Sequence, residues 1–204
     1  MFTGIVQSQA EVFSVNNRNN LSQLIICVAE AFIDKLTLGA SIAINGVCLT
    51  VVKFEITNNK AFVSFDIIDE TLAISNLANI KVGDLLNVER SLKMGDELGG
   101  HIVSGHVHSK ATLIERIETS TNCCLRFSLA TKWHKYILAK GFITLNGISL
   151  TVGEVTTEYF SVHLIPETLA RTNLATLTVN DEINVELDQQ TITIVTTIER
   201  MKLS

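Results

Sequence analysis

The sequence predicts an all-β fold built as two similar β-barrels in tandem, and three observations support this prediction. Valine, isoleucine and threonine, which favour strands, are abundant throughout the 204 residues. Apolar runs are short and are separated by turn signals rather than by long helical patterns. The chain also repeats itself, because SIAINGVCLTVV (41–52) returns as FITLNGISLTVG (142–153) with six of twelve positions identical.

The repeat extends in both directions from this motif. At the same offset of 101 residues, FTGIVQSQAEVF (2–13) aligns with VSGHVHSKATLI (103–114). At an offset of 97, residues 70–89 align with residues 167–186, and twelve of these twenty positions are identical. The chain is therefore expected to consist of two homologous domains.

The boundary between the halves is expected at KMGDELGG (93–100), a polar, glycine-rich stretch typical of a linker. We predict an N-terminal barrel at residues 1–95, a C-terminal barrel at residues 96–188 and a separate terminal segment at residues 189–204.

The elements of each half are predicted to be short strands. Alternating or β-branched runs occur at 22–30, 40–56 and 60–68, and again at 123–130, 141–156 and 159–165. Asn-Gly at 45–46 and at 146–147 indicates a tight hairpin turn between two apolar runs. A small domain with many short strands closes most readily into a barrel, which removes exposed strand edges.

Short helical pieces are expected between the strands. They fit residues 30–38 and 130–139, where Phe32 and Trp133 align on the packing side, and single helical turns fit the two ETLA segments. In the terminal segment, the apolar stripe of a helix is expected from Ile192, Ile194, Val195 and Ile198. That stripe serves either oligomerisation or packing against its own barrel, and the sequence leaves both open.

Composition limits the possible partners and compartment. A net charge of -5 gives no electrostatic reason to bind nucleic acid. The four cysteines (27, 48, 123 and 124) show no CxxC or metal-ligand spacing, which is typical of free thiols in a reducing compartment. No apolar run reaches the length of a membrane span, and the N-terminus does not have the pattern of a signal peptide. We therefore expect a cytoplasmic protein without a membrane or metal partner.

Five motifs, in order and spread over essentially the whole chain, resemble the riboflavin synthase family. They are MFTGIV (1–6), NGVCLTV (45–51), GGHIVSGHV (99–107), NGISLTV (146–152) and LIPETL with TNL (164–174). The resemblance implies two six-stranded antiparallel Greek-key β-barrels, a C-terminal helix at 189–204 for trimerisation, and a homotrimer. It also implies active sites between the N-terminal barrel of one subunit and the C-terminal barrel of its neighbour.

Members of this family convert two molecules of 6,7-dimethyl-8-ribityllumazine into riboflavin and 5-amino-6-ribitylaminouracil, in riboflavin biosynthesis. A four-carbon unit passes from one molecule to the other without a cofactor. Two identical substrates require two similar pockets, which a duplicated barrel supplies. The alternative is a non-catalytic lumazine- or flavin-binding protein, which tends to lose the motifs of the second barrel. Those motifs are present here and favour the enzyme.

Four residues are predicted to carry the chemistry: Cys48, His106, Ser149 and Asp188. Cys48 and Ser149 occupy one repeated position that diverged, and a thiol is a better nucleophile than a hydroxyl near neutral pH. His106 aligns with Ile5 and would transfer the proton of the lumazine methyl group. Asp188 aligns with Ser91 and would orient a serine or histidine.

Hydroxyl and backbone groups suit a pyrimidine-dione edge and a ribityl chain. The predicted substrate-binding residues are Phe2, Gly4, Ser41, Thr50, Thr71, His101, Thr151, Ile165 and Thr168. Residues shared by both halves are expected to bind what the two substrates share. The sequence does not decide which pocket holds the donor or which group is the nucleophile, and His108 has no assigned role.

Overall fold

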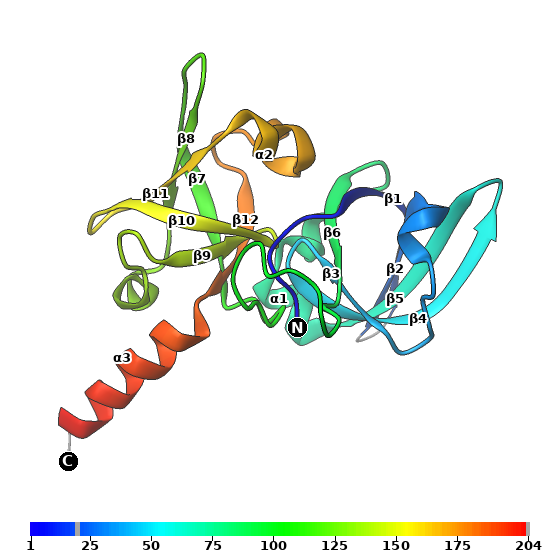
Figure 1. Ribbon diagram of the computed structural model, residues 1–204, viewed down its shortest axis with the longest axis horizontal. Helices are drawn as coiled ribbons and strands as arrows, with labels where there is room; N and C mark the ends of the chain where they lie inside the picture. Colours follow the sequence, from blue (N-terminus) through cyan, green and yellow to red (C-terminus); the bar gives the residue numbers. More distant parts are fainter. Residues whose placement is uncertain (19–20, 203–204) are drawn as a thin grey trace.

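Two closed antiparallel barrels lie side by side in the computed structural model, which describes residues 1–18 and 21–202, and a helix extends from the second barrel (Figure 1). The predicted all-β fold of duplicated six-stranded barrels with a C-terminal helix is confirmed. The last two residues of the predicted terminal segment, 203–204, lie outside the described residues.

The two barrels have the same strand order. The N-terminal barrel runs β1-β2-β5-β4-β3-β6, and the C-terminal barrel runs through the equivalent strands β7-β8-β11-β10-β9-β12. Strands β3 to β5 form a meander and β6 returns beside β3, which is a Greek key. The strands are β1 Ser8–Arg18, β2 Leu21–Ala29, β3 Ser41–Ile44, β4 Val47–Thr57, β5 Lys60–Ile68, β6 Leu85–Arg90, β7 Ser109–Glu118, β8 Cys123–Ser128, β9 Phe142–Leu145, β10 Ile148–Val155, β11 Phe160–Leu164 and β12 Glu182–Leu187.

Even the irregularities of the sheets are repeated. The β1–β2 register shifts after Val12, and the β7–β8 register shifts after Leu113, the aligned position. The β4–β5 register shifts after Val51, and the β10–β11 register shifts after Val152. Such shifts bend a strand and increase its twist, which a small barrel needs in order to close.

Each barrel has its own apolar core. Alternation produces it: along β2 every second residue is buried, and Leu24, Ile26 and Val28 face inward. The connecting segments form short helices. They are η1 Glu30–Ile33, α1 Asp69–Ile74, η2 Asn76–Asn79, η3 Thr131–Tyr136, α2 Pro166–Arg171 and η4 Asn173–Thr176. The helical pieces expected at 30–38 and 130–139 are thus single short 3-10 segments.

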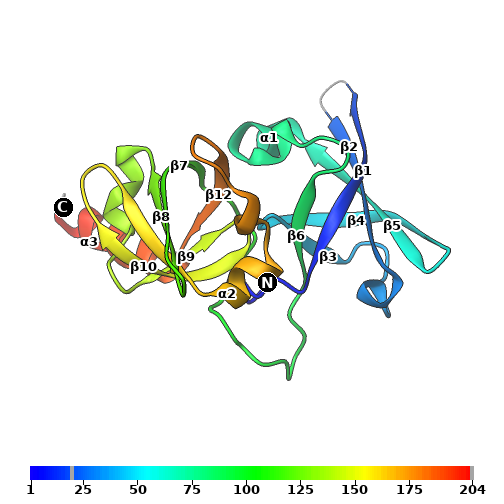
Figure 2. The same ribbon diagram turned by 90° about the horizontal axis from the view of Figure 1, so that it is seen from above.

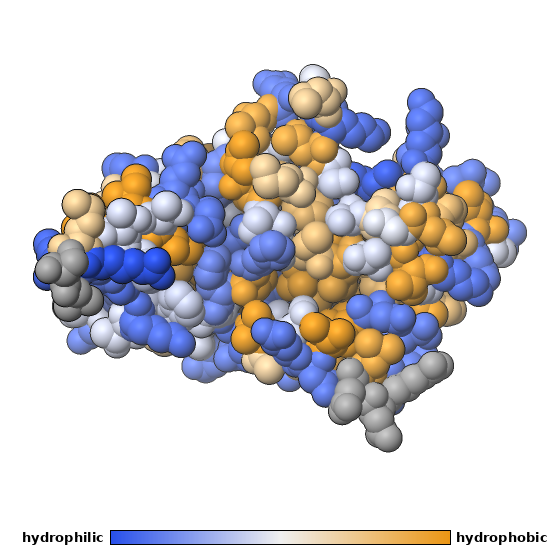
Figure 3. Space-filling model, turned by 90° about the horizontal axis from the view of Figure 1, so that it is seen from below, coloured by the Kyte–Doolittle hydropathy of each residue, from blue (hydrophilic) through white to orange (hydrophobic). Residues whose placement is uncertain are grey.

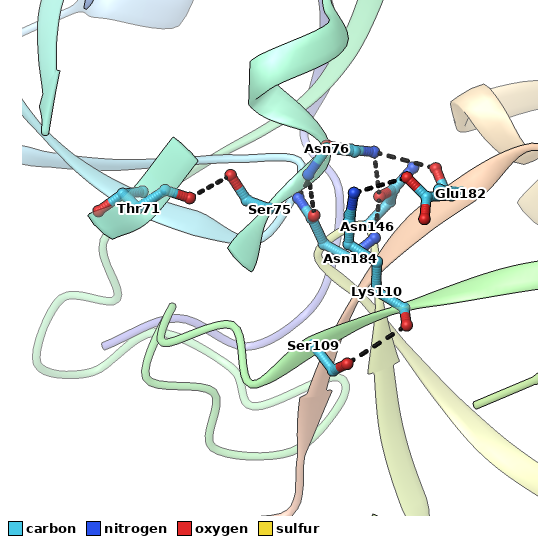
Figure 4. Close-up of polar contacts among 8 residues, drawn as sticks. All are labelled: Thr71, Ser75, Asn76, Ser109, Lys110, Asn146, Glu182 and Asn184. Atoms are coloured by element: carbon cyan, nitrogen blue, oxygen red, sulfur yellow. Dashed lines mark hydrogen bonds and ion pairs between the residues drawn. The ribbon is translucent and has the colours of Figure 1, made fainter. Parts of the chain in front are cut away.

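A cluster of asparagines joins the barrels. Asn76 at the start of η2 reaches across to the C-terminal barrel, where its side-chain amide donates to Asn146 Oδ1 (3.1 Å) and its backbone N–H donates to Asn184 Oδ1 (2.6 Å) (Figure 4). Asn184 Nδ2 in turn donates to the Asn45 carbonyl (2.9 Å). The residues at the aligned positions make the equivalent contact in the other direction: Asn87 Nδ2 donates to the Asn146 carbonyl (3.0 Å). The interface therefore has an approximate two-fold axis.

The helix α3 (Gln189–Lys202) continues from β12 and contacts only part of its own barrel. Ile192 packs against the C-terminal core, and Lys135 forms an ion pair with Glu199. Ile194 and Ile198 remain 60% and 48% exposed. Within residues 1–18 and 21–202, no helix is both long enough and apolar enough to cross a membrane.

Candidate active site

The outer face of the first hairpin, β3–β4, carries the predicted N-terminal site residues. Ser41 lies opposite Thr50, and Ala43 lies opposite Cys48. Because directly opposed and alternate residues share one face of a sheet, these side chains all project away from the core. The intervening residues Ile42, Ile44, Leu49 and Val51 are buried in the core. The structure thus brings Ser41, Cys48 and Thr50 together.

The second hairpin, β9–β10, presents the equivalent face. Phe142 lies opposite Thr151, and Thr144 lies opposite Ser149. Thr151 and Thr50 are both exposed, so each hairpin face is open to the surface of a single chain. The two faces differ at three of four positions.

Two extended segments cross over these faces. We call residues 2–5 the N-terminal arm and residues 101–106 the linker arm. Phe2 and Val103 exchange backbone hydrogen bonds (2.7 and 3.0 Å) where the arms meet. Figure 2 shows the connection that contains the linker arm (green) crossing between the barrels beside the N-terminus.

Each arm lies against one hairpin through a glycine. Ser149 N–H donates to the Gly4 carbonyl (2.8 Å), and Cys48 N–H donates to the Gly105 carbonyl (2.9 Å). Both glycines have φ values, +74° and +83°, that side chains rarely adopt. A Cβ atom on Gly4 would lie 2.6 Å from Ser149 Cβ, and one on Gly105 would lie 2.5 Å from Cys48 Cβ. Only glycine permits this close approach.

Two buried glutamates hold the arms. The carboxylate of Glu89 accepts from Thr3 N–H (2.6 Å), Thr3 Oγ1 (2.7 Å) and Gly4 N–H (3.0 Å). Glu186 accepts the equivalent three bonds from Ser104 and Gly105. Burial raises the pKa of both carboxyl groups, and these hydrogen bonds partly offset that shift. Sequence reasoning missed both residues, although the signal was present: each ends an identical NVE triplet of the repeat.

Ser149 contacts His101, not His106. His101 Nδ1 lies 2.6 Å from Ser149 Oγ, and the imidazole stacks on Phe142 with ring centroids 4.8 Å apart. Burial lowers the pKa of His101, and the nearby Asp188 carboxylate partly opposes this. His101, predicted only as a binding residue, is therefore the imidazole paired with the serine. His106 is exposed on the same arm, and it slightly offsets the burial that raises the pKa of Glu186.

Asp188 immediately precedes helix α3 and caps its N-terminus. Its carboxylate accepts from the backbone N–H (2.9 Å) and hydroxyl (2.7 Å) of Thr191, which is an N-cap arrangement. The same carboxylate acts electrostatically on His101. Asp188 thus links the start of the helix to the histidine of the hairpin face.

The remaining predicted residues lie on other elements. Phe2 is fully buried in a small apolar cluster with Ala43 and Val103, and Cys48 packs against this cluster. Thr71 on α1 and Thr168 on α2 are half-buried, and their carbonyls accept hydroxyl bonds from Ser75 (Figure 4) and Thr172. Ile165, just before α2, is 62% exposed.

Apolar surface gathers around the arms. Ile5, Ile102 and Phe142 are 46%, 50% and 52% exposed. Figure 3, a view from below, shows apolar surface over the middle of the molecule. In the part of the chain that the structure describes, no group of three or more His, Cys, Asp or Glu side chains is arranged to hold a metal ion.

Comparison with known proteins identifies the family. The model of the lumazine binding domain matches twice, at residues 3–91 and 104–188. Riboflavin synthase of Escherichia coli (strain K12) is 46% identical over 202 residues, covering 98% of this chain and 93% of that protein. Riboflavin synthase of Chlamydia muridarum is 40% identical, covering 99% of this chain and 97% of that protein.

A solved structure has the same fold. The crystal structure of LumP complexed with riboflavin superposes with a TM-score of 0.83 at 25% identity, covering 93% of this chain and all of that chain. Two matches to one domain model within the chain agree with the two barrels, and both relatives, which align over almost their full length, are riboflavin synthases. This chain belongs to the riboflavin synthase family.

Proposed function

We propose that this chain converts two molecules of 6,7-dimethyl-8-ribityllumazine into riboflavin and 5-amino-6-ribitylaminouracil by transfer of a four-carbon unit. The observation that carries the proposal is the pair of equivalent hairpin faces, each contacted by the glycine of one arm and each bearing a different reactive group. Equivalent faces suit two copies of one substrate. The divergence of Cys48 and Ser149 allows one copy to donate and the other to accept.

The proposed residue roles follow this division. Thr50 and Thr151, identical in the repeat, would bind groups that both substrates share. Ser41 beside Cys48 would bind the N-terminal ligand, while Ser149 with His101 would act on the C-terminal ligand. His106, exposed at the end of the linker arm, is a candidate for proton transfer to the lumazine methyl group.

The other predicted binding residues complete the two ligand sites. Thr71 would serve the N-terminal ligand, and Thr168 and Ile165 would serve the C-terminal one. Phe2 and Gly4 would shape the base of the site through the N-terminal arm, whose close packing depends on Gly4. Asp188 would act through His101 rather than on the ligand.

We further propose that the active site is completed by a second copy of this chain, in a homotrimer. Both hairpin faces are open in one chain, and apolar side chains such as Ile5 and Ile102 surround them. Ile194 and Ile198 of α3 offer a second apolar surface that the chain's own barrel leaves exposed. An N-terminal barrel facing a neighbour's C-terminal barrel would enclose one ligand on each hairpin face.

The decisive experiment is incubation of the purified chain with 6,7-dimethyl-8-ribityllumazine alone, with riboflavin and remaining substrate quantified after chromatography. One riboflavin formed for every two lumazines consumed is the expected result. Binding of unchanged lumazine without product would identify a ligand carrier and would overturn the enzymatic proposal. Analytical ultracentrifugation of the same sample tests the trimer independently of activity.

A further inference from the structure

His101 lies between two hydroxyl groups. Its Nδ1 is 2.6 Å from Ser149 Oγ, and its Nε2 is 3.3 Å from Thr144 Oγ1. A neutral imidazole has one N–H donor and one acceptor nitrogen, so the two hydroxyls cannot play the same role toward it. Which nitrogen carries the proton therefore decides what Ser149 can do.

The two hydroxyls differ in burial. Thr144 is 1% exposed, and among the described residues its hydroxyl has one recorded hydrogen-bond partner, His101. Ser149 is half-buried on the open hairpin face, where a bound ligand can accept its proton. Leaving a buried donor without an acceptor is unfavourable, because the group has lost its hydrogen bonds to water. The arrangement that satisfies the buried donor has Thr144 O–H donating to Nε2.

We propose that Thr144 is a positioning residue that holds His101 as the Nδ1–H tautomer. The consequence for catalysis rests on the function proposed above for the hairpin face that carries Ser149. Nδ1–H then donates to Ser149 Oγ, and the Ser149 hydroxyl proton points to the ligand. Ser149 is consequently a hydrogen-bond donor to an acceptor atom of the substrate, such as a ring nitrogen or carbonyl. In the opposite tautomer, the Ser149 hydroxyl would donate to Nδ1 of His101, and His101 could then activate the serine as a nucleophile.

The N-terminal barrel cannot form this arrangement. Ala43 stands where Thr144 is, and Ser41 stands where Phe142 stacks on the imidazole. The positioning device therefore belongs to one half alone, beside the residue that diverged.

The test is histidine-labelled ¹⁵N NMR of the full chain without ligand, in which long-range ¹⁵N–¹H correlations distinguish the two tautomers. The His101 signals are assigned by their loss in His101→Gln. We expect the Nδ1–H tautomer in the wild-type chain and in Thr144→Ser, and a shift toward Nε2–H in Thr144→Val. An Nε2–H tautomer in the wild-type chain, or an unchanged tautomer in Thr144→Val, overturns the proposal.

Kinetics provide a second readout. Thr144→Val is expected to lower kcat for riboflavin formation about ten- to a hundredfold with little change in KM, and Thr144→Ser is expected to restore it. Ser161→Ala is the control, because it also removes a buried hydroxyl of the same barrel, one that accepts from Glu154 N–H (2.8 Å) away from His101. It should leave both the tautomer and kcat unchanged. If neither the wild type nor any variant forms riboflavin, the proposed function is wrong. The NMR measurement of the His101 tautomer still tests the role of Thr144 in that case.

Discussion

The two barrels are nearly identical where they build the fold and different where they face a ligand. The asparagine cluster, the paired glutamates and the arm glycines occur in both halves at aligned positions. On the hairpin faces, Ser41, Ala43 and Cys48 are replaced by Phe142, Thr144 and Ser149. The packing is thus the same in both halves, while only the C-terminal hairpin face has a serine that contacts a histidine of the linker arm.

This difference shows where the two halves can differ while the barrel cores stay the same. The outward residues of each hairpin lie outside both apolar cores. The asparagines satisfy one another across the interface, so a change in one leaves buried partners unpaired.

The largest effect is expected at Ser149, the position where the C-terminal hairpin face differs in its reactive group from the N-terminal one. Ser149→Ala removes the hydroxyl beside His101 and is expected to lower kcat about 10²- to 10³-fold with little change in ligand affinity. His106→Gln is expected to act in the same way if it transfers the methyl proton. Steady-state kinetics measure kcat, and a separate ligand titration measures the affinity. Wild-type turnover in both variants would remove the proposed proton handling from this barrel.

A second change tests the close approach of the linker arm. Gly105→Ala places a Cβ 2.5 Å from Cys48 Cβ at a φ of +83° and is expected to cost about 3 kcal/mol or more of unfolding free energy. Gly39→Ala is the matched control, since its φ is +82° but nothing lies within 4 Å of the added atom. It should cost about 1–2 kcal/mol. If urea denaturation shows that Gly105→Ala and Gly39→Ala lose the same unfolding free energy, the close approach of the linker arm to Cys48 does not add to the cost.

A third pair of variants measures the symmetry of the interface. Asn87→Ala and Asn184→Ala each remove a side chain that bonds the opposite barrel, and each is expected to destabilise the chain by about 2–3 kcal/mol. If the approximate two-fold axis holds energetically, the two losses agree to within about 1 kcal/mol. A much larger loss for one variant would show that the halves no longer share the interface equally.

The smallest effect concerns His108, whose Nδ1 accepts from Leu187 N–H (3.2 Å) and whose ring lies against Trp133. Burial, with His106 nearby, lowers its pKa below the ordinary 6.5. The folded chain therefore binds this proton less tightly than the unfolded chain. Stability from this group is complete above about pH 6.5 and is lost as pH falls through the lowered pKa.

The N-terminal barrel supplies the matched variant. Gln7 aligns with His108, and its Oε1 accepts from Arg90 N–H (3.0 Å) in the same way. In His108→Gln the glutamine keeps the hydrogen-bond acceptor but cannot titrate. As the pH is lowered below 6.5, the unfolding free energy of this variant should therefore decrease less than that of the wild type. Identical slopes in chemical denaturation would show that His108 does not titrate in this window.

The sequence by itself determined the two barrels, their duplication and the hairpins that carry Cys48 and Ser149. These follow from local signals: strand alternation, the Asn-Gly turns and identities at a constant offset. It also named the residues that diverged, because the two halves provide their own alignment.

Only the tertiary structure decided which histidine meets the serine. His101 and His106 are five residues apart in one glycine-rich segment, and both fit the sequence pattern. The path of that segment is set by distant contacts, namely the Phe2–Val103 pairing and the hydrogen bonds that Ser104 and Gly105 donate to Glu186. The capping role of Asp188 and the position of Thr144 beside His101 were equally hidden. Contacts between residues far apart in the chain leave no periodic signal, and they are what assembles this site.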